Sequence, residues 1–218
     1  MPTGPAGLQE WAQYQDQAYQ QVGSGFLFML ADGEVVGVTS AHSVSFRNPE
    51  QPLERIALGI AGLAGFVGEF DTLMGQPGNP LRPDNLAVDY LLLKVDPPLK
   101  HDIVLSPDPR GAPQPGERVS VYSGVNPGGQ GNRTFAGTVQ SVDDKSVWVL
   151  MDEWFNPSQM SGSPLISQHT GKVVGMVLAA SPRSNRLLLG AHPMGSLVQL
   201  AESATEFPKI ADLALGSD

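Results

Sequence analysis

The stretch that decides the fold is residues 159–165, which read QMSGSPL and lead through a glycine turn into the apolar run VVGMV at 173–177. A serine hydroxyl is a weak nucleophile at neutral pH. It becomes reactive when a neighbouring base accepts its proton and a third group orients that base. Two upstream motifs supply both groups: His42 in VTSAHS and Asp89 in VDYLLLKV. Ser161, His42 and Asp89 are therefore a candidate nucleophile, base and orienting carboxylate.

The composition predicts a mostly β protein without disulfides or thiolate metal sites. The chain has 218 residues, 41% of them hydrophobic, which suffices for one domain or two small, closely packed ones. Glycine (25) and proline (19) make up about a fifth of the sequence, which favours many short strands over long helices. With no cysteine, neither a disulfide nor a thiolate metal site can form, and a bacterial source is favoured.

The charge pattern bears on partners and location. The net charge is −9 and the 13 basic residues are scattered, so we expect no nucleic-acid partner, no membrane partner and no cofactor. The first twenty residues lack the basic start and apolar core of a signal peptide. We therefore expect either a cytoplasmic protein, or a periplasmic or secreted one from which a leader has been removed.

The first half of the chain predicts a short helix followed by a β-barrel. Leu8, Trp11, Tyr14 and Ala18 are spaced as on one helical face, which predicts a docking helix over residues 8–21. Next comes a hairpin of strands at 23–30 and 35–39, then two strands within 54–73 and a buried strand at 86–95 that carries Asp89. The first barrel spans about 22–96, and the proline-rich stretch at about 97–115 is the linker.

The second half predicts another six-stranded barrel, at about 116–193, followed by a short helix at about 194–204. Its strands alternate with turns rich in Gly, Asn and Asp, and they are expected at 118–122, 134–142, 147–151, 164–167, 173–179 and 186–191. The predicted fold is therefore all-β, with two six-stranded antiparallel barrels and short helices at both ends.

Six motifs in order make the chain resemble a known family over about residues 23–200. They are GSGF at 23–26, TSAH at 39–42, DYLLLKV at 89–95, PGERV at 115–119 with GTV at 137–139, SGSPL at 161–165 with GKVVGM at 171–176, and GAHP at 190–193. The chain resembles the chymotrypsin-like (trypsin-like) serine peptidases, and among them the bacterial HtrA-like (Deg-type) branch. The His, Asp, Ser order is the order of that family.

The resemblance implies a single trypsin-like peptidase domain over residues 1–218, with the active cleft between its barrels. It implies a serine endopeptidase that cleaves proteins or peptides through an acyl-enzyme, with His42, Asp89 and Ser161 in the roles given above. The oxyanion would meet the amides of Ser161 and Gln159, with Ser158 as the alternative to Gln159. No PDZ module is expected, because only about twenty residues follow the terminal helix.

The nucleophile loop departs from the family pattern. Gln159 and Ser163 stand where the family has glycines, and the stretch NPSQMS at 156–161 is one residue longer than the HtrA-like form. Glycine is used where a backbone conformation resists a Cβ, so Gln159 is expected either to tilt its amide away from the oxyanion or to sit in a rebuilt loop. The alternative function is therefore a protease-fold binding or scaffold protein with an impaired oxyanion hole. A serine esterase or an autoproteolytic processing domain is a further possibility.

The substrate pocket is expected from the resemblance at Phe155, Leu178, Ala179 and Ala180. Because no carboxylate is evident there, we expect small or medium apolar side chains at the cleavage site.

Other candidate residues have simpler interpretations. Three aspartates compete with Asp89 for the triad but have the neighbours of solvated turn residues, and three histidines have no partner at metal-ligand spacing, so no metal is expected. A glycine cluster lacks the lysine and helix of a phosphate loop and is interpreted as a hairpin tip. The three aspartates are Asp84, Asp96 and Asp102, and the three histidines are His101, His169 and His192. The glycine cluster contains Gly128, Gly129 and Gly131.

Overall fold

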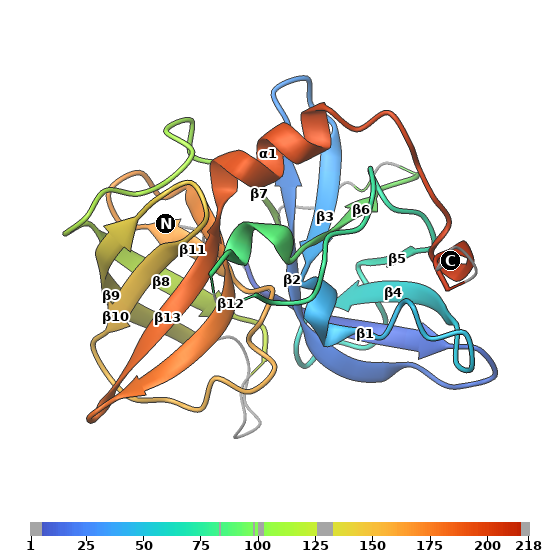
Figure 1. Ribbon diagram of the computed structural model, residues 1–218, viewed down its shortest axis with the longest axis horizontal. Helices are drawn as coiled ribbons and strands as arrows, with labels where there is room; N and C mark the ends of the chain where they lie inside the picture. The colour runs from blue at the N-terminus through green and yellow to red at the C-terminus, as the bar shows by residue number, and fades with distance from the viewer. Residues whose placement is uncertain (1–5, 83, 98, 100–102, 126–132, 215–218) are drawn as a thin grey trace.

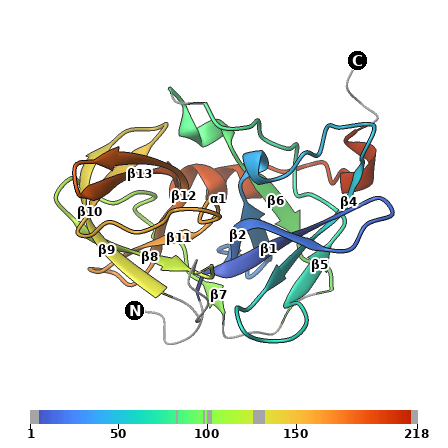
Figure 2. The ribbon, with the colours of Figure 1, turned by 90° about the horizontal axis from the view of Figure 1, so that it is seen from below.

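The computed structural model describes residues 6–82, 84–97, 99, 103–125 and 133–214, and it is built mostly of β-strands (Figure 1). Strands from the first half of the chain form one curled sheet, and strands from the second half form a closed barrel. The two halves lie side by side in both ribbon views (Figures 1 and 2). The expectation of a mostly β fold in two halves is confirmed.

The sheet of the first half curls into a half-barrel, whereas a regular six-stranded barrel was expected. Its strand order is β5-β4-β1-β2-β3-β6, and β7 adds to β2 in parallel, within the segment expected to be only a linker. The two ends of the path, β5 and β6, do not pair directly in the described residues, but Leu73, three residues after β5, forms an antiparallel bridge with Leu93 of β6. The strands are β1 (Leu8–Tyr14), β2 (Gln20–Met29), β3 (Val35–Thr39), β4 (Leu53–Gly59), β5 (Gly68–Phe70), β6 (Leu91–Lys94) and β7 (Val104–Leu105).

The predicted N-terminal helix is wrong, because that segment is strand β1. Leu8, Glu10 and Ala12 are buried and alternate with more exposed neighbours, which is the period of a strand. β1 pairs with β2 on one edge and with β4 on the other. Two flanking strands satisfy more of its backbone groups than an isolated helix would, and this pairing overrides the helical spacing of the apolar residues.

Asp89 lies before a strand and not within one, contrary to the prediction. It is the C-cap of a short 3-10 turn, η2 (Leu86–Val88), and β6 begins two residues later at Leu91. The Asn85 side chain accepts a hydrogen bond from the amide of Ala87 at 3.1 Å and so caps the turn. Because Asp89 lies outside β6, its side chain is not held to one face of the sheet, and its carboxylate points toward the end of β3.

All six strands expected in the second half are present and close into a barrel of order β10-β13-β12-β11-β8-β9. Apolar side chains that alternate along these strands, among them Val119, Val149, Leu165 and Leu189, fill its interior. The strands are β8 (Arg118–Ser123), β9 (Arg133–Val142), β10 (Val147–Met151), β11 (Pro164–Ser167), β12 (Val173–Arg183) and β13 (Arg186–Pro193).

A shared core joins the two halves. The expected terminal helix is present as α1 (Met194–Glu202), which follows β13 and crosses above both halves in Figure 1. Its residues Met194 and Leu197 pack in one buried cluster with Phe26 and Phe28 of β2 and with Met176 of β12. This cluster fixes the position of one half against the other. No helix in the described part of the chain is long and apolar enough to cross a membrane.

Candidate active site

The three candidate catalytic side chains meet between the two halves. His42 lies in a 3-10 turn, η1 (Ala41–Ser43), that directly follows β3. Its Nδ1 is 2.5 Å from Asp89 Oδ2, and its Nε2 is 2.9 Å from Ser161 Oγ, although His42 and Ser161 are 119 residues apart. The imidazole therefore joins a carboxylate of the first half to a hydroxyl of the second.

Asp89 is fully buried, and N–H groups surround its carboxylate. The amides of Ala41 and His42 donate to Oδ1 at 2.6 and 3.1 Å, in addition to the contact of His42 Nδ1 with Oδ2. These donors compensate for the water lost on burial. Because an ionised carboxylate only accepts, Nδ1 carries the hydrogen and Nε2 is left to accept the Ser161 proton.

The competing aspartates do not take this place. Asp84 and Asp96 are exposed, and neither is hydrogen-bonded to His42. Asp102 lies outside the described residues.

The nucleophile loop is clamped to β2 by neutral groups. The amide of Ser24 donates to the Ser161 carbonyl at 3.0 Å, and the Ser24 hydroxyl donates to the Gln159 carbonyl at 2.7 Å. Gly162 has φ +94° and approaches β2 so closely that a Cβ there would lie 1.8 Å from the Ser24 carbonyl oxygen. Glycine is therefore required immediately after Ser161.

Gln159 has φ +61°, in the left-handed region that glycine usually occupies. Holding a non-glycine residue there costs about 1 kcal/mol. Its side chain exchanges hydrogen bonds with Gln21, since Gln21 Nε2 donates to Gln159 Oε1 at 3.3 Å and Gln159 Nε2 donates to the Gln21 carbonyl at 3.4 Å. The loop thus holds Gln159 in the conformation that the family's glycine would favour.

Between residues 158 and 163, two amides have no protein acceptor within the described part of the chain: those of Gln159 and Ser161. The amide of Ser158, by contrast, donates to Asn156 Oδ1 at 3.0 Å. Unpaired amides beside a nucleophile are the donors that a developing oxyanion requires. The oxyanion role of Gln159 and Ser161 stays a prediction.

The four residues expected in the substrate pocket lie in different environments. Phe155 stacks on Phe135 at 3.9 Å inside the second barrel, and Leu178 is buried in the core between the halves. The carbonyl of Leu178 accepts from Ser161 Oγ at 3.2 Å, and Ala179 and Ala180 follow it as β12 becomes accessible. The structure thus brings β12 to the nucleophile and places the Phe155 side chain in the core. Their role in a pocket stays a prediction.

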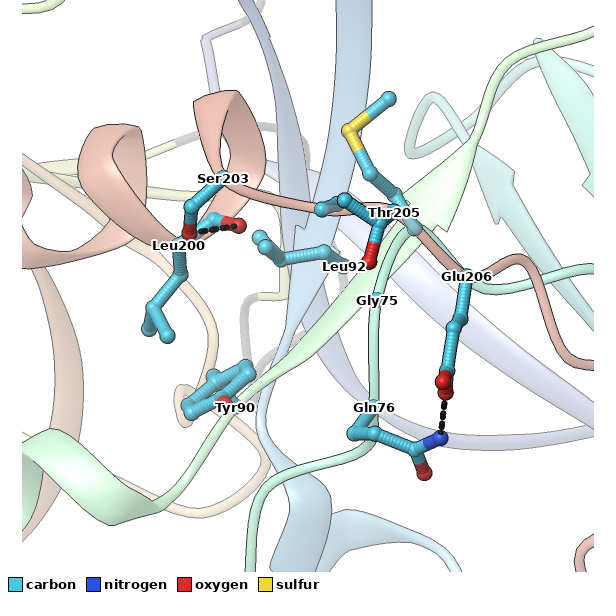
Figure 3. A pocket seen from close by; sticks show the side chains of 10 residues that line it. Gly75, Gln76, Tyr90, Leu92, Leu200, Ser203, Thr205 and Glu206 are labelled. Atoms are coloured by element: carbon cyan, nitrogen blue, oxygen red, sulfur yellow. Dashed lines mark hydrogen bonds between the residues drawn. The ribbon is translucent and has the colours of Figure 1, made fainter.

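A cavity of about 300 Å³ lies between the end of α1 and β6 (Figure 3). Tyr90, the residue after Asp89, lines it together with Leu92 and Leu200, and at its edge Gln76 Nε2 donates to Glu206 Oε2. None of the three candidate catalytic residues lines this cavity, so it is separate from the candidate active site.

The remaining histidines fit structural or surface roles. His192 is buried, its Nδ1 lies 3.0 Å from the Pro193 carbonyl, and burial lowers its pKa to about 4. His169 is exposed. In the described ranges no three His, Cys, Asp or Glu side chains are grouped as metal ligands would be. His101 and residues 128–131 lie outside those ranges.

Three residues that support the site were missed from the sequence. Ser24 and Gln21 hold the nucleophile loop, and Glu10 lies fully buried with its Oε2 2.7 Å from Ser43 Oγ. Burial raises the pKa of Glu10 to about 8, against the opposing effect of the nearby Ser43 and Thr39 hydroxyls. The alternation of Leu8, Glu10 and Ala12 is the sequence pattern that could have predicted a buried strand face with Glu10 on it. A charged residue in the middle of the pattern made it hard to recognise.

No protein-family model and no curated protein sequence matches the chain, but solved structures share its fold. A thermostable serine protease, AL20, from an extremophilic microorganism has a TM-score of 0.62 at 12% identity, over 94% of this chain and 99% of that one. Kallikrein-related peptidase 10 has a TM-score of 0.60 at 17% identity, over 91% and 94%. The serine endoprotease of Yersinia pestis has a TM-score of 0.58 at 17% identity, over 93% of this chain and 65% of that one. The chain has the chymotrypsin-like two-barrel fold, which it shares with a serine protease, a serine endoprotease and a peptidase.

Proposed function

We propose that this protein is a serine endopeptidase that hydrolyses peptide bonds through His42, Asp89 and Ser161. The observation that carries the proposal is the pair of contacts made by one imidazole, 2.5 Å to Asp89 and 2.9 Å to Ser161. A histidine oriented by a buried carboxylate and in contact with a serine hydroxyl is the arrangement that activates serine toward carbonyl carbon.

The proposed reaction has two halves. Ser161 Oγ attacks the peptide carbonyl while His42 Nε2 accepts the hydroxyl proton, and the imidazolium then returns that proton to the leaving amine. Water deacylates the ester in the same way, with His42 again serving as the base. Asp89 keeps the hydrogen on Nδ1 throughout and stabilises the imidazolium.

Two features support binding of the reacting peptide. The amides of Gln159 and Ser161, which have no acceptor in the described ranges, are available to the oxyanion, and one such donor is worth about 3 kcal/mol in the transition state. Among the described strands, β11 pairs with β12 only as far as Met176, so the edge of β12 from Leu178 onward has no strand on that side. An extended peptide would add to this edge as a further strand, beside Ala179 and Ala180.

The finer assignment rests on the sequence motifs. We propose a single trypsin-like peptidase domain of the bacterial HtrA-like branch, acting on protein or peptide substrates with small or medium apolar residues at the cleavage site. The apolar preference is supported by Ala179 and Ala180, which bring no charge to the start of the β12 edge.

Covalent labelling tests the function directly. A fluorophosphonate probe should label the wild-type protein and leave Ser161→Ala unlabelled, and only the wild type should hydrolyse a peptide ester. Wild-type protein that is folded but neither labelled nor active would reject the peptidase and favour the binding or scaffold alternative. Ester hydrolysis without peptide hydrolysis would favour a serine esterase.

A further inference from the structure

A buried carboxyl lies where β1, the histidine turn and the nucleophile loop meet. Glu10 has no exposed surface, and within the described residues its Oε1 has no hydrogen-bond partner. A Cβ added to Gly23 would lie 2.5 Å from Glu10 Oε2, 3.2 Å from Ser43 Cβ and 3.4 Å from the Ser161 carbonyl oxygen. Glu10 therefore lies against the backbone that carries both His42 and Ser161.

The hydrogen bonds around Ser43 indicate which form of Glu10 fits. Ser43 Oγ lies 2.7 Å from Glu10 Oε2, 2.9 Å from the Ser40 carbonyl and 3.1 Å from Ser40 Oγ. The Ser43 hydroxyl has one hydrogen and two lone pairs. If Glu10 is ionised, its carboxylate and the Ser40 carbonyl compete for that one hydrogen. If Glu10 is protonated, it donates to Ser43, Ser43 donates to the Ser40 carbonyl, and Ser40 Oγ donates to Ser43.

The charges around Glu10 favour the protonated form as well. The charge of Asp89 raises the pKa of Glu10, and His42 lies in the adjoining turn, next to Ser43. β2 and residues 156–163 of the nucleophile loop contain no ionisable side chain. β4 contributes Glu54 and Arg55, and Arg55 pairs with Gln13 at the far end of β1. No cation in the described chain forms an ion pair with Glu10.

We propose that protonated Glu10 is a positioning residue for His42, and that its ionisation above neutral pH loosens the turn from Ser40 to Ser43 and slows the reaction. The proposal rests on the proposed peptidase function. Ionised Glu10 takes the Ser43 hydrogen from the Ser40 carbonyl and so opens the turn whose amides, at Ala41 and His42, bind Asp89. The imidazole then loses its alignment with Ser161, because its carboxylate anchor depends on that turn.

The kcat–pH profile on a peptide ester tests the role. Between pH 7 and 9 the wild type should lose about tenfold in kcat, as for one titrating group. The kcat of Glu10→Gln should stay within about twofold of its pH 7 value up to pH 9, because the glutamine amide donates to Ser43 at every pH. The control Glu54→Gln, on the neighbouring strand β4, should follow the wild type. A Glu10→Gln profile that superimposes on the wild-type profile would overturn the proposal.

Ser43→Ala provides a second variant at a half-buried position. It removes the group through which Glu10 acts, so kcat should be low at pH 7 and change less than twofold up to pH 9. A Ser43→Ala protein with the wild-type rate and profile would also overturn the role.

A spectroscopic titration separates this proposal from the proposed function. The ring ¹⁵N shifts of His42 should show an inflection near pH 8 that is absent in Glu10→Gln, whereas exposed His169 should show none that depends on Glu10. Absence of fluorophosphonate labelling at any pH would reject the peptidase, yet this titration would still report the link to His42. A His42 titration that is the same in both proteins would overturn the link, even in an active enzyme.

Discussion

The turn that carries His42 (η1) and the loop that carries Ser161 (residues 156–163) are joined by the hydrogen bond between these two side chains. Ionisable groups hold the turn in place, whereas neutral groups hold the loop. The turn is anchored by two fully buried carboxyl groups, Asp89 and Glu10. The loop from 156 to 163 contains no ionisable residue and is held by the amide and hydroxyl of Ser24 and by the side chain of Gln21.

The two kinds of anchor respond to different perturbations. A buried carboxyl changes its partners when its protonation changes, so the base side of the site is sensitive to pH. Neutral hydrogen bonds and close backbone contacts do not titrate, so the nucleophile side is sensitive to shape. Substitutions on each side should separate these responses.

The largest expected effect falls on the hydrogen bond that joins the two sides. If the proposed triad is correct, Ser161→Ala and His42→Ala should each lower kcat for a peptide substrate by about 10⁶-fold, and the double variant should be no worse, because the members of a catalytic triad act as a unit. Circular dichroism and thermal unfolding should show both variants folded. Turnover in Ser161→Ala comparable to that of the wild type would reject the nucleophile.

The carboxylate anchor comes second. Asp89→Asn should lower kcat by about 10⁴-fold near neutral pH, because the amide favours the wrong histidine tautomer. The exposed residues Asp84 and Asp96 serve as matched controls, and their Asn variants should keep the wild-type rate. If one of the controls loses the activity instead, the triad assignment is wrong.

Gly162 tests the steric anchor of the nucleophile side. Gly162→Ala should lower the free energy of unfolding by about 3 kcal/mol or more, because its Cβ meets the Ser24 carbonyl at a positive φ. Gly116 also has a positive φ, +83°, but has open space around it, so Gly116→Ala should cost only about 1 kcal/mol. Equal denaturant midpoints for the two variants would contradict the close contact.

The stability of Glu10→Gln relative to the wild type should depend on pH. The pKa of Glu10 is raised from 4.5 to about 8, so the native state keeps a proton that the unfolded chain loses. Wild-type stability should therefore fall, relative to Glu10→Gln, as pH rises from about 4.5 to about 8, by on the order of a few kcal/mol. Denaturant titrations at pH 4, 6 and 9 measure this, and a gap that is constant with pH would contradict it.

The smallest effect is expected at Gln159. Gln159→Gly relieves the strain at φ +61° but removes the hydrogen bonds to Gln21, so peptide-ester turnover should be unchanged or a few-fold lower. Gln21→Ala removes only the bond from Gln21 Nε2 to Gln159 Oε1, because the Gln21 carbonyl belongs to the backbone, so it should lower turnover no further than Gln159→Gly does. A clear rise in turnover for Gln159→Gly would show instead that the glutamine holds the oxyanion hole closed.

Local pattern predicted most of the second barrel. Its six strands follow from alternating apolar residues punctuated by glycine and asparagine turns, and such signals lie within a few residues of each other. The order of His42, Asp89 and Ser161 and the motifs around them likewise predicted which side chains come together. In the first half, β1 and the turn before β6 were mispredicted, because pairing with distant strands decided both.

The sequence by itself determined the two-part β architecture and the identity of the residues that meet at the site, because alternation, turn residues and motif order are local properties of the chain. Only the tertiary structure decided that Glu10 is buried beside Ser43, that Gln159 takes a left-handed backbone and that, among the described residues, neither its amide nor that of Ser161 has an acceptor. Each of these depends on contacts with strands far away along the chain, and on desolvation that no local pattern encodes.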